Sequence, residues 1–238
     1  HCLGLIGMIS TFGMLGRTAT LHVYAPSEYE KMLQMQMEMF CTGLEFQVEF
    51  HPVDTTTHQT IYEDKSLSIE TIPLEHRIPC CGYLFREKPT LPHIRRDVID
   101  FYEIPISQIN NIKNGTDWIT VEGELIPNKR LTLPSEAPRS YAYCSDTRYM
   151  PSLSKQLKNV TMLYHESTYD EQNKQRAKMF YHSTAAQAAT VARDANVNTL
   201  LLGHYSARYD DEFALLKEAK NIFPNSHLSN EGDIFDVK

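Results

Sequence analysis

The sequence predicts an α/β domain, in which short buried strands alternate with helices along most of the 238 residues. Apolar runs typical of buried strands span Tyr141–Cys144, Val160–Tyr164 and Thr199–Leu202, and the Ala-rich run Ala185–Ala195 has the composition of a helix. A residue that can bind a metal ion or move a proton follows each of the three strands. Open α/β sheets present their chemistry where strands end, so we expect one functional site there.

The N-terminal third predicts two helices and two strands. Leu5–Leu15 is apolar and contains two glycines, which indicates a closely packed helix or turn. Ser27 has the position of an N-cap for a second helix that ends near Gly43. Apolar residues alternate in the segments 46–50 and 67–69, as in strands.

Two features of the predicted helices concern packing. Thr184 and Gln187 have the spacing of a capping box at the start of the Ala-rich helix. The helix after Ser27 carries four closely spaced methionines: Met32, Met35, Met37 and Met39. A plastic core face and a subunit contact both explain such a helix.

The segment from Arg86 to about Gly123 is predicted to be an inserted arm, because prolines, an Asn-Asn pair and one Asn-Gly turn interrupt its polar stretches. Its start, 86–96, holds four basic residues against one acid, but over Arg86–Trp118 five basic residues balance five acids. A nucleic-acid contact and a solvated hairpin both fit this composition.

The composition limits the classes of protein to which the chain can belong. The chain is 42% hydrophobic and 22% charged, and no apolar run reaches the roughly 18 residues of a membrane span, so we expect no membrane segment. The five cysteines are odd in number and lack the spacing of a disulfide framework, which favours free thiols in a reducing compartment. The net charge of −7 gives no general basic surface for nucleic acid.

Six segments hold the residues that carry chemistry: His1-Cys-Leu-Gly-Leu5, Leu74-Glu-His-Arg-Ile-Pro79, Cys144-Ser-Asp-Thr147, His165-Glu-Ser-Thr168, His182-Ser-Thr184 and Leu202-Gly-His-Tyr205. Imidazole nitrogens and carboxylate oxygens suit divalent ions, and two such ions clamp the reacting oxygens of a phosphodiester. Each segment alone is equally explained by a hydrogen-bonded core histidine or a turn-capping aspartate. The order of all six is what makes them specific.

In that order, the segments resemble ribonuclease Z, the tRNA 3′-processing branch of the metallo-β-lactamase superfamily. The resemblance covers essentially the whole chain, 1–238. It implies a metallo-β-lactamase-like αββα sandwich, lacking an N-terminal portion, with an inserted exosite arm that grips tRNA.

The resemblance also implies a metal centre. His76 would bind one metal, His1 and His204 the other, and Asp146 would bridge both. We expect two zinc ions, with manganese or another divalent ion as the alternative. The family's general-base aspartate and two further histidine ligands would precede His1, so the 238 residues alone are expected to bind an incomplete metal set and to be inactive.

Further roles follow for residues near this centre. His182 is expected to protonate the leaving 3′ oxygen, and Glu166 to orient the His182 ring. His165 is expected to position the site or bind substrate. Arg148 and Arg208 are candidates for phosphate contacts. The plainer alternatives are structural hydrogen bonds for Glu166 and His182 and ordinary surface positions for the arginines.

The implied activity is hydrolysis of precursor tRNA after the discriminator nucleotide, leaving a 3′-hydroxyl on the tRNA and a 5′-phosphate on the trailer. The resemblance also implies a cytoplasmic homodimer. Two other functions fit parts of the pattern: a hydrolase of small phosphodiesters or sulfate esters, and a metal-free binding protein of the same fold. Precursor cleavage separates the first from ribonuclease Z, and bound metal excludes the second.

Overall fold

A seven-stranded mixed sheet forms the body of the computed structural model, which describes residues 2–238. The strand order is β13-β12-β11-β10-β5-β4-β3. The strands are β3 (Thr60–Glu63), β4 (Leu67–Pro73), β5 (Cys81–Glu87), β10 (Ser140–Cys144), β11 (Met162–Glu166), β12 (Thr199–Gly203) and β13 (Ser226–Leu228). Strands β10 to β13 are parallel, and β5 pairs antiparallel with β10. His1, one of the expected metal ligands, lies outside the described residues.

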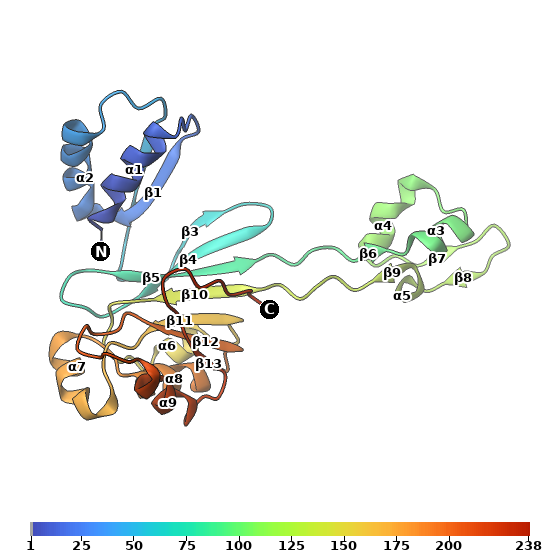
Figure 1. The fold of residues 1–238 in the computed structure, drawn as a ribbon. Helices are drawn as coiled ribbons and strands as arrows, with labels where there is room; N and C mark the ends of the chain where they lie inside the picture. The colour runs from blue at the N-terminus through green and yellow to red at the C-terminus, as the bar shows by residue number, and fades with distance from the viewer. Residues whose placement is uncertain (1) are drawn as a thin grey trace.

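Helices cover the parallel half of the sheet (Figure 1). They are α6 (Leu153–Gln156), α8 (Ala185–Asp194) and α9 (Phe213–Lys220), whereas α7 (Lys174–Phe180) lies to one side and contributes no residue to the core that these helices share with the sheet. Buried alanines of α8 pack with strand residues such as Leu163 and Leu200, because small side chains let a helix approach a sheet closely. The predicted capping box is confirmed: Gln187 N donates to Thr184 Oγ1 (3.1 Å), and Thr184 N donates to Gln187 Oε1 (3.0 Å).

The N-terminal unit contains α1 (Gly4–Met14), β1 (Leu21–Pro26), α2 (Ser27–Phe40) and β2 (Val48–Val53). Its two strands are parallel and separate from the main sheet (Figure 1). Ile9, Val23, Leu33 and Phe46 form its core. Ser27 is not the N-cap that the sequence suggested: it is the first residue of α2, and Pro26 precedes it without a side-chain cap.

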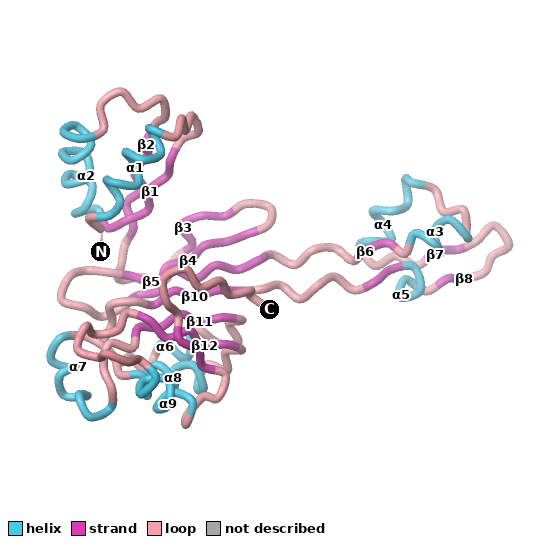
Figure 2. Tube along the Cα trace, in the orientation of Figure 1, coloured by secondary structure: helices cyan, strands magenta, loops and turns pink. Residues whose placement is uncertain are grey.

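The arm leaves the sheet at the end of β5 and returns at Ser140, the first residue of β10. Its tip lies far from the sheet at the end of two loop segments (Figure 2). The tip contains β6 (His93–Ile94), α3 (Arg96–Phe101), a 3-10 turn (Ile106–Gln108), α4 (Ile109–Lys113), β7 (Trp118–Ile119), β8 (Leu125–Ile126), α5 (Asn128–Leu131) and β9 (Thr132–Leu133). The predicted end at Gly123 is therefore too early, because Ile126 and Leu131 complete a small core with Ile99 and Ile112.

The expectation of free thiols holds for the described residues. All five cysteines are free. Within residues 2–238, no helix is long and apolar enough to cross a membrane.

Candidate active site

The carboxyl ends of β10, β11 and β12 bring three predicted residues together. Asp146 follows β10, Glu166 ends β11 and His204 follows β12. Because these strands are parallel neighbours, their carboxyl ends share one edge of the sheet. Asp146 (φ 54°) and His204 (φ 57°) both have left-handed backbones, a conformation that few non-glycine residues adopt but that Asp and His adopt more readily than most.

Hydrogen bonds orient His204 toward Asp146. His204 Nε2 lies 3.1 Å from Asp146 Oδ1, and His204 Nδ1 lies 2.9 Å from Thr168 Oγ1. The Thr168 hydroxyl has one proton, and its shortest contact is to Glu166 Oε2 at 2.6 Å. If that proton is donated to Glu166, Thr168 Oγ1 accepts from His204 Nδ1–H, and in the neutral ring the lone pair of Nε2 then faces the acceptor Asp146 Oδ1, an arrangement that a cation bound to both atoms would stabilise.

His76 reaches the same edge from the loop after β4. Its Nδ1 donates to the carbonyl oxygen of Tyr181 (3.0 Å), which leaves Nε2 for another contact. The loop itself is tied to the segment after Asp146: Arg148 N donates to Glu75 O (3.0 Å). Backbone carbonyls commonly fix metal-binding histidines in this manner.

These side chains fit part of a divalent metal centre. Ligand atoms of His76, Asp146 and His182 lie within 4.8 Å of one another, as do those of Glu166, His182 and His204. Nitrogen and carboxylate oxygen are donors suited to zinc and manganese, and both His76 and His204 have their second ring nitrogen held by the scaffold. His182 belongs to both groups, which the sequence did not indicate.

Glu166 is a fully buried carboxylate surrounded by donors. Its Oε1 accepts from Thr147 N (2.8 Å) and from His182 Nδ1 (2.8 Å), and its Oε2 accepts from Ser183 N (3.0 Å) and the Thr168 hydroxyl. The expected Glu166–His182 hydrogen bond is therefore present. Glu166 also joins the segments after β10, after β11 and before α8.

The charge around His182 favours its protonated form. Burial by itself acts to lower the pKa of His182, but the hydrogen bond and negative charge of Glu166, together with Asp146, outweigh burial and raise it. The ring of His182 stacks on that of His204 with centroids 5.3 Å apart. A protonatable nitrogen is thus held beside the residues that would bind metal.

His165 has a different position from the one a substrate contact requires. Its side chain is fully buried, its Nδ1 donates to the carbonyl of Glu166 (2.8 Å), and burial lowers its pKa. A side chain without exposed surface does not reach an RNA bound outside, so the expected substrate contact does not fit this placement. The alternative expectation, a positioning role next to Glu166, does fit.

A basic hollow of about 570 Å³ opens beside His182. Its lining residues are Arg148, Tyr149, Lys174, Gln175, Lys178, His182 and Gln187. Arg148 Nε donates to Glu75 Oε2 (2.6 Å), and the guanidinium lies 5.5 Å from the Tyr181 ring centre. The sequence indicated Arg148 but not the lysines, although their i, i+4 spacing just before the His182 segment was a usable signal. Arg208 is exposed and is not part of this lining.

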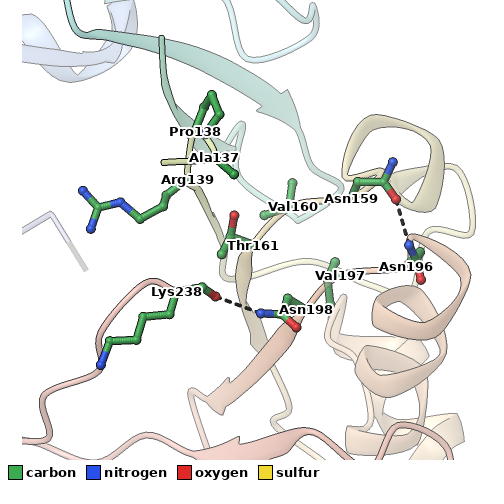
Figure 3. A pocket seen from close by; sticks show the side chains of 10 residues that line it. All are labelled: Ala137, Pro138, Arg139, Asn159, Val160, Thr161, Asn196, Val197, Asn198 and Lys238. Atoms are coloured by element: carbon green, nitrogen blue, oxygen red, sulfur yellow. Dashed lines mark hydrogen bonds between the residues drawn. The ribbon is translucent and has the colours of Figure 1, made fainter. Parts of the chain in front are cut away.

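A second hollow, of about 330 Å³, lies at the opposite ends of the strands (Figure 3). Asn196 Nδ2 donates to Asn159 Oδ1 (2.9 Å), and Asn198 Nδ2 donates to the carbonyl of Lys238 (2.8 Å). Apart from Arg139 and Lys238, its lining is made of amide, hydroxyl and aliphatic groups. The titratable groups gather instead at the edge that holds Asp146.

Comparison with known proteins gives a consistent assignment. A scan against protein-family profiles finds no match. Ribonuclease Z of Bacteroides fragilis is 54% identical over 231 residues, which are 97% of this chain and 76% of that protein. The human short-form tRNase Z has a TM-score of 0.64 at 18% identity, over 100% of this chain and 75% of that one.

A metallo-β-lactamase-fold protein of Bacillus subtilis, YhfI, has a TM-score of 0.60 at 16% identity, over 98% and 71% of the two chains. The expected metallo-β-lactamase fold is thereby confirmed. By the level and extent of its identity to the Bacteroides fragilis protein, this chain belongs to the ribonuclease Z family of the metallo-β-lactamase superfamily.

Proposed function

We propose that this member of the ribonuclease Z family removes 3′ trailers from precursor tRNA, leaving a 3′-hydroxyl on the tRNA and a 5′-phosphate on the trailer. The observation that carries the proposal is the convergence of His76, Asp146 and His204 beside the Glu166–His182 pair. The high identity to a ribonuclease Z supports the substrate class. Membership of a nuclease family favours this function over that of a metal-free binding protein.

The metal and the protein have separate tasks in this proposal. His76, Asp146 and His204 would hold divalent cations, zinc in the first instance, together with His1, which is outside the described residues. Bound cations would supply Lewis acidity toward the phosphate and lower the pKa of water. Asp146 contributes a carboxylate with two oxygens, the ligand type that can be shared between two cations.

His182 supplies the proton for the leaving 3′ oxygen. Its Nδ1 is held by Glu166, so Nε2 is the nitrogen from which a proton can be transferred. Because Glu166 and Asp146 raise the pKa of His182, the imidazolium form persists to higher pH than for a free histidine. Glu166 acts through His182 and positions it without contacting the RNA.

The basic hollow beside His182 is proposed to bind RNA phosphates. Lys174 and Lys178 lie one helical turn apart on α7, and with Arg148 they place three cations around a 570 Å³ space. Arg208 would add a further phosphate contact outside the hollow. Arg148 and Lys174 are each paired with a carboxylate, Glu75 and Glu171, so Lys178 is the cation of the hollow best placed to meet a phosphate.

Replacing Lys178 by alanine is expected to raise KM for precursor tRNA severalfold with little change in kcat, because the lysine contacts phosphate in both ground and transition states. The dependence of log KM on log salt should also become shallower by about one unit, and by about two in the Lys174→Ala/Lys178→Ala double variant. Steady-state cleavage between 50 and 200 mM salt measures both effects. Lys220→Ala is the matched control, since the last turn of α9 lies at the opposite end of the strands. Equal salt slopes in all variants would exclude the phosphate contacts.

The arm is proposed to grip tRNA away from the cut. Between Lys88 and Arg139 it carries seven basic and seven acidic residues, so its net charge does not attract RNA. Its tip offers specific groups instead: Arg95, Arg130 and the 77% exposed ring of Phe101 surround a shallow hollow of about 300 Å³. Aromatic rings and arginines bind nucleic acids by stacking and by phosphate contacts.

Deleting residues 91–135 and joining the ends with a short Gly/Ser linker tests the arm. Glu87 N donates to Arg139 O (2.9 Å) three residues inside each new end, so a short linker should close the gap and leave the sheet intact. We expect kcat/KM for precursor tRNA to fall about 10- to 100-fold, since each lost stacking contact is worth about 1–3 kcal/mol. Turnover of a chromogenic phosphodiester should be unchanged in the same protein. If the deletion variant cleaves precursor tRNA as efficiently as wild type, the arm does not bind the substrate.

A homodimer in the cytoplasm completes the proposal. Met35 and Met39 of α2 are 54% and 69% exposed, whereas Leu33 of the same helix is buried, so α2 has a second apolar face. Sedimentation of the full-length protein should give twice the mass of its single chain, and Met35→Glu/Met39→Glu should give a monomer. If the wild-type protein sediments as a monomer, the proposed homodimer is wrong.

The proposed cytoplasmic location is supported by the five free cysteines, which are typical of a reducing compartment.

The function itself is tested with an end-labelled precursor tRNA and the full-length protein. The proposal expects one cut after the discriminator nucleotide and the two stated end groups, identified by ligation and by phosphatase sensitivity. Hydrolysis of a chromogenic diester without precursor cleavage would instead support a small-substrate hydrolase.

A further inference from the structure

A second cluster of metal-binding side chains lies on the N-terminal unit. It consists of His22 on β1 and Glu49 and His51 on β2. His22 is the register partner of Glu49, and His51 is the partner of Tyr24. Because side chains alternate along a strand, these residues share the face opposite Val23, which is buried in the core of the unit. The cluster shares no residue with the candidate active site.

The spacing of the three side chains matches a small cation. His22 Nδ1 lies 2.9 Å from His51 Nε2 and 3.4 Å from Glu49 Oε2, and His51 Nε2 lies 3.7 Å from Glu49 Oε1. Ligands at zinc bond lengths of about 2.0–2.1 Å in a tetrahedron are about 3.3 Å apart. The observed distances bracket this value, so only small side-chain shifts would admit an ion.

The protonation of the cluster also favours a cation. Two ring nitrogens 2.9 Å apart cannot both carry protons directed at each other, so at least one presents a lone pair. Glu49 adds a carboxylate, an acceptor without a donor. The side chains of His22, Glu49 and His51 are 49%, 57% and 30% exposed, which leaves a path for an ion and room for water as a fourth ligand.

The ring of His51 is held in place by its neighbours. Tyr24 stacks on it with centroids 4.5 Å apart and planes 13° from parallel. The carbonyl of Tyr24 accepts from the Tyr83 hydroxyl on β5 (3.2 Å), which connects this part of β1 to the main sheet. An oriented ring has less freedom to lose when it binds a metal.

We propose that His22, Glu49 and His51 form a second binding site for a borderline divalent cation such as Zn²⁺. Two imidazoles and one carboxylate suit zinc better than magnesium or calcium, which prefer oxygen ligands. An ion bound by residues of both strands cross-links β1 and β2. It therefore stabilises the N-terminal unit and plays no part in RNA cleavage.

His58 provides a matched control. Its Nε2 lies 2.9 Å from Glu70 Oε2, so an exposed histidine again pairs with a carboxylate, here a partly buried one. This pair does not belong to a group of three or more metal-binding residues among those described. His58→Gln thus removes an imidazole that is also paired with a carboxylate and leaves His22, Glu49 and His51 unchanged.

The test counts zinc bound per chain by equilibrium dialysis and atomic absorption, in the full-length protein and in an Asp146→Ala background that weakens the active-site metal. We expect His51→Gln and His22→Gln to lose one zinc equivalent, or at least about 10- to 100-fold in its affinity, in both backgrounds. His58→Gln should retain it. Zinc should also raise the thermal transition of Asp146→Ala, and His51→Gln should abolish that rise.

Equal zinc uptake by wild type and His51→Gln would overturn the proposal. Glu49→Gln serves as a second variant, and circular dichroism confirms that each protein is folded before titration. Precursor tRNA cleavage by zinc-saturated His51→Gln should equal that of wild type. The result is therefore independent of the proposed RNA chemistry, since failure of precursor cleavage in every protein would leave the zinc count unaffected.

Discussion

Asp146→Ala should lower kcat/KM for precursor tRNA by at least about 10³-fold, because loss of the bridging metal ligand that we propose Asp146 to be would remove several kcal/mol of transition-state stabilisation. Asp146 lies where β10 ends, and its Oδ1 is 3.1 Å from His204 Nε2. Its replacement therefore removes the carboxylate at the middle of the proposed metal-binding residues. The substitution removes a partly buried carboxylate at the sheet edge and not a core side chain, so the fold should persist. Single-turnover cleavage and metal content, measured on the same preparation, check the two effects together.

Asp194→Ala is the control for this experiment. Asp194 is a surface aspartate at the end of α8 that pairs with Arg193, so its loss should leave both cleavage and metal content unchanged. Asp146→Asn keeps the side-chain volume and should resemble Asp146→Ala if charge and metal binding are what matter. Full activity in either Asp146 variant would remove this residue from the catalytic machinery.

Glu166→Ala should reduce the free energy of unfolding by about 3–5 kcal/mol, the usual cost of removing one partner from a buried ionic network. The substitution leaves the buried amides of Thr147 and Ser183 without an acceptor. It also releases His182, so the variant should lose cleavage even at temperatures where it remains folded. Urea denaturation followed by circular dichroism gives the stability, and cleavage below the transition gives the activity.

Glu166→Gln distinguishes folding from catalysis. The amide retains one acceptor oxygen and nearly the same volume, so we expect a smaller loss of stability but a persistent loss of kcat. Glu231→Ala, at an exposed position outside α2 and the arm, should change neither quantity. Wild-type kcat in Glu166→Gln would contradict the positioning of His182 by this carboxylate.

The sequence predicted the site's location because the parallel strands have a simple signature. An apolar run such as Thr199–Leu202 indicates a buried strand. The polar residue that follows each such run is then expected at the carboxyl end of that strand. The capping box of α8 was equally local, since it depends on residues three positions apart. His1 stays a prediction, as do the catalytic and metal-binding roles of the other residues.

Features that depend on distant contacts were not predictable. Glu166 accepts from Thr147, Thr168, His182 and Ser183, and no sequence spacing reveals that these donors meet. The end of the arm was missed because Ile126 packs against Ile99 and Ile112 across turns that look like ordinary loop. Ser27 resembles a cap by type, but Pro26 takes that position at the start of α2.

The central claim is that His76, Asp146 and His204 bind the divalent cation used for RNA cleavage. Anomalous diffraction at the zinc edge, from crystals of the full-length protein soaked in zinc, tests it most directly. The account predicts an anomalous peak at about 2.0–2.2 Å from a carboxylate oxygen of Asp146 and from Nε2 of His204. A zinc-saturated crystal without a peak beside Asp146 would contradict it.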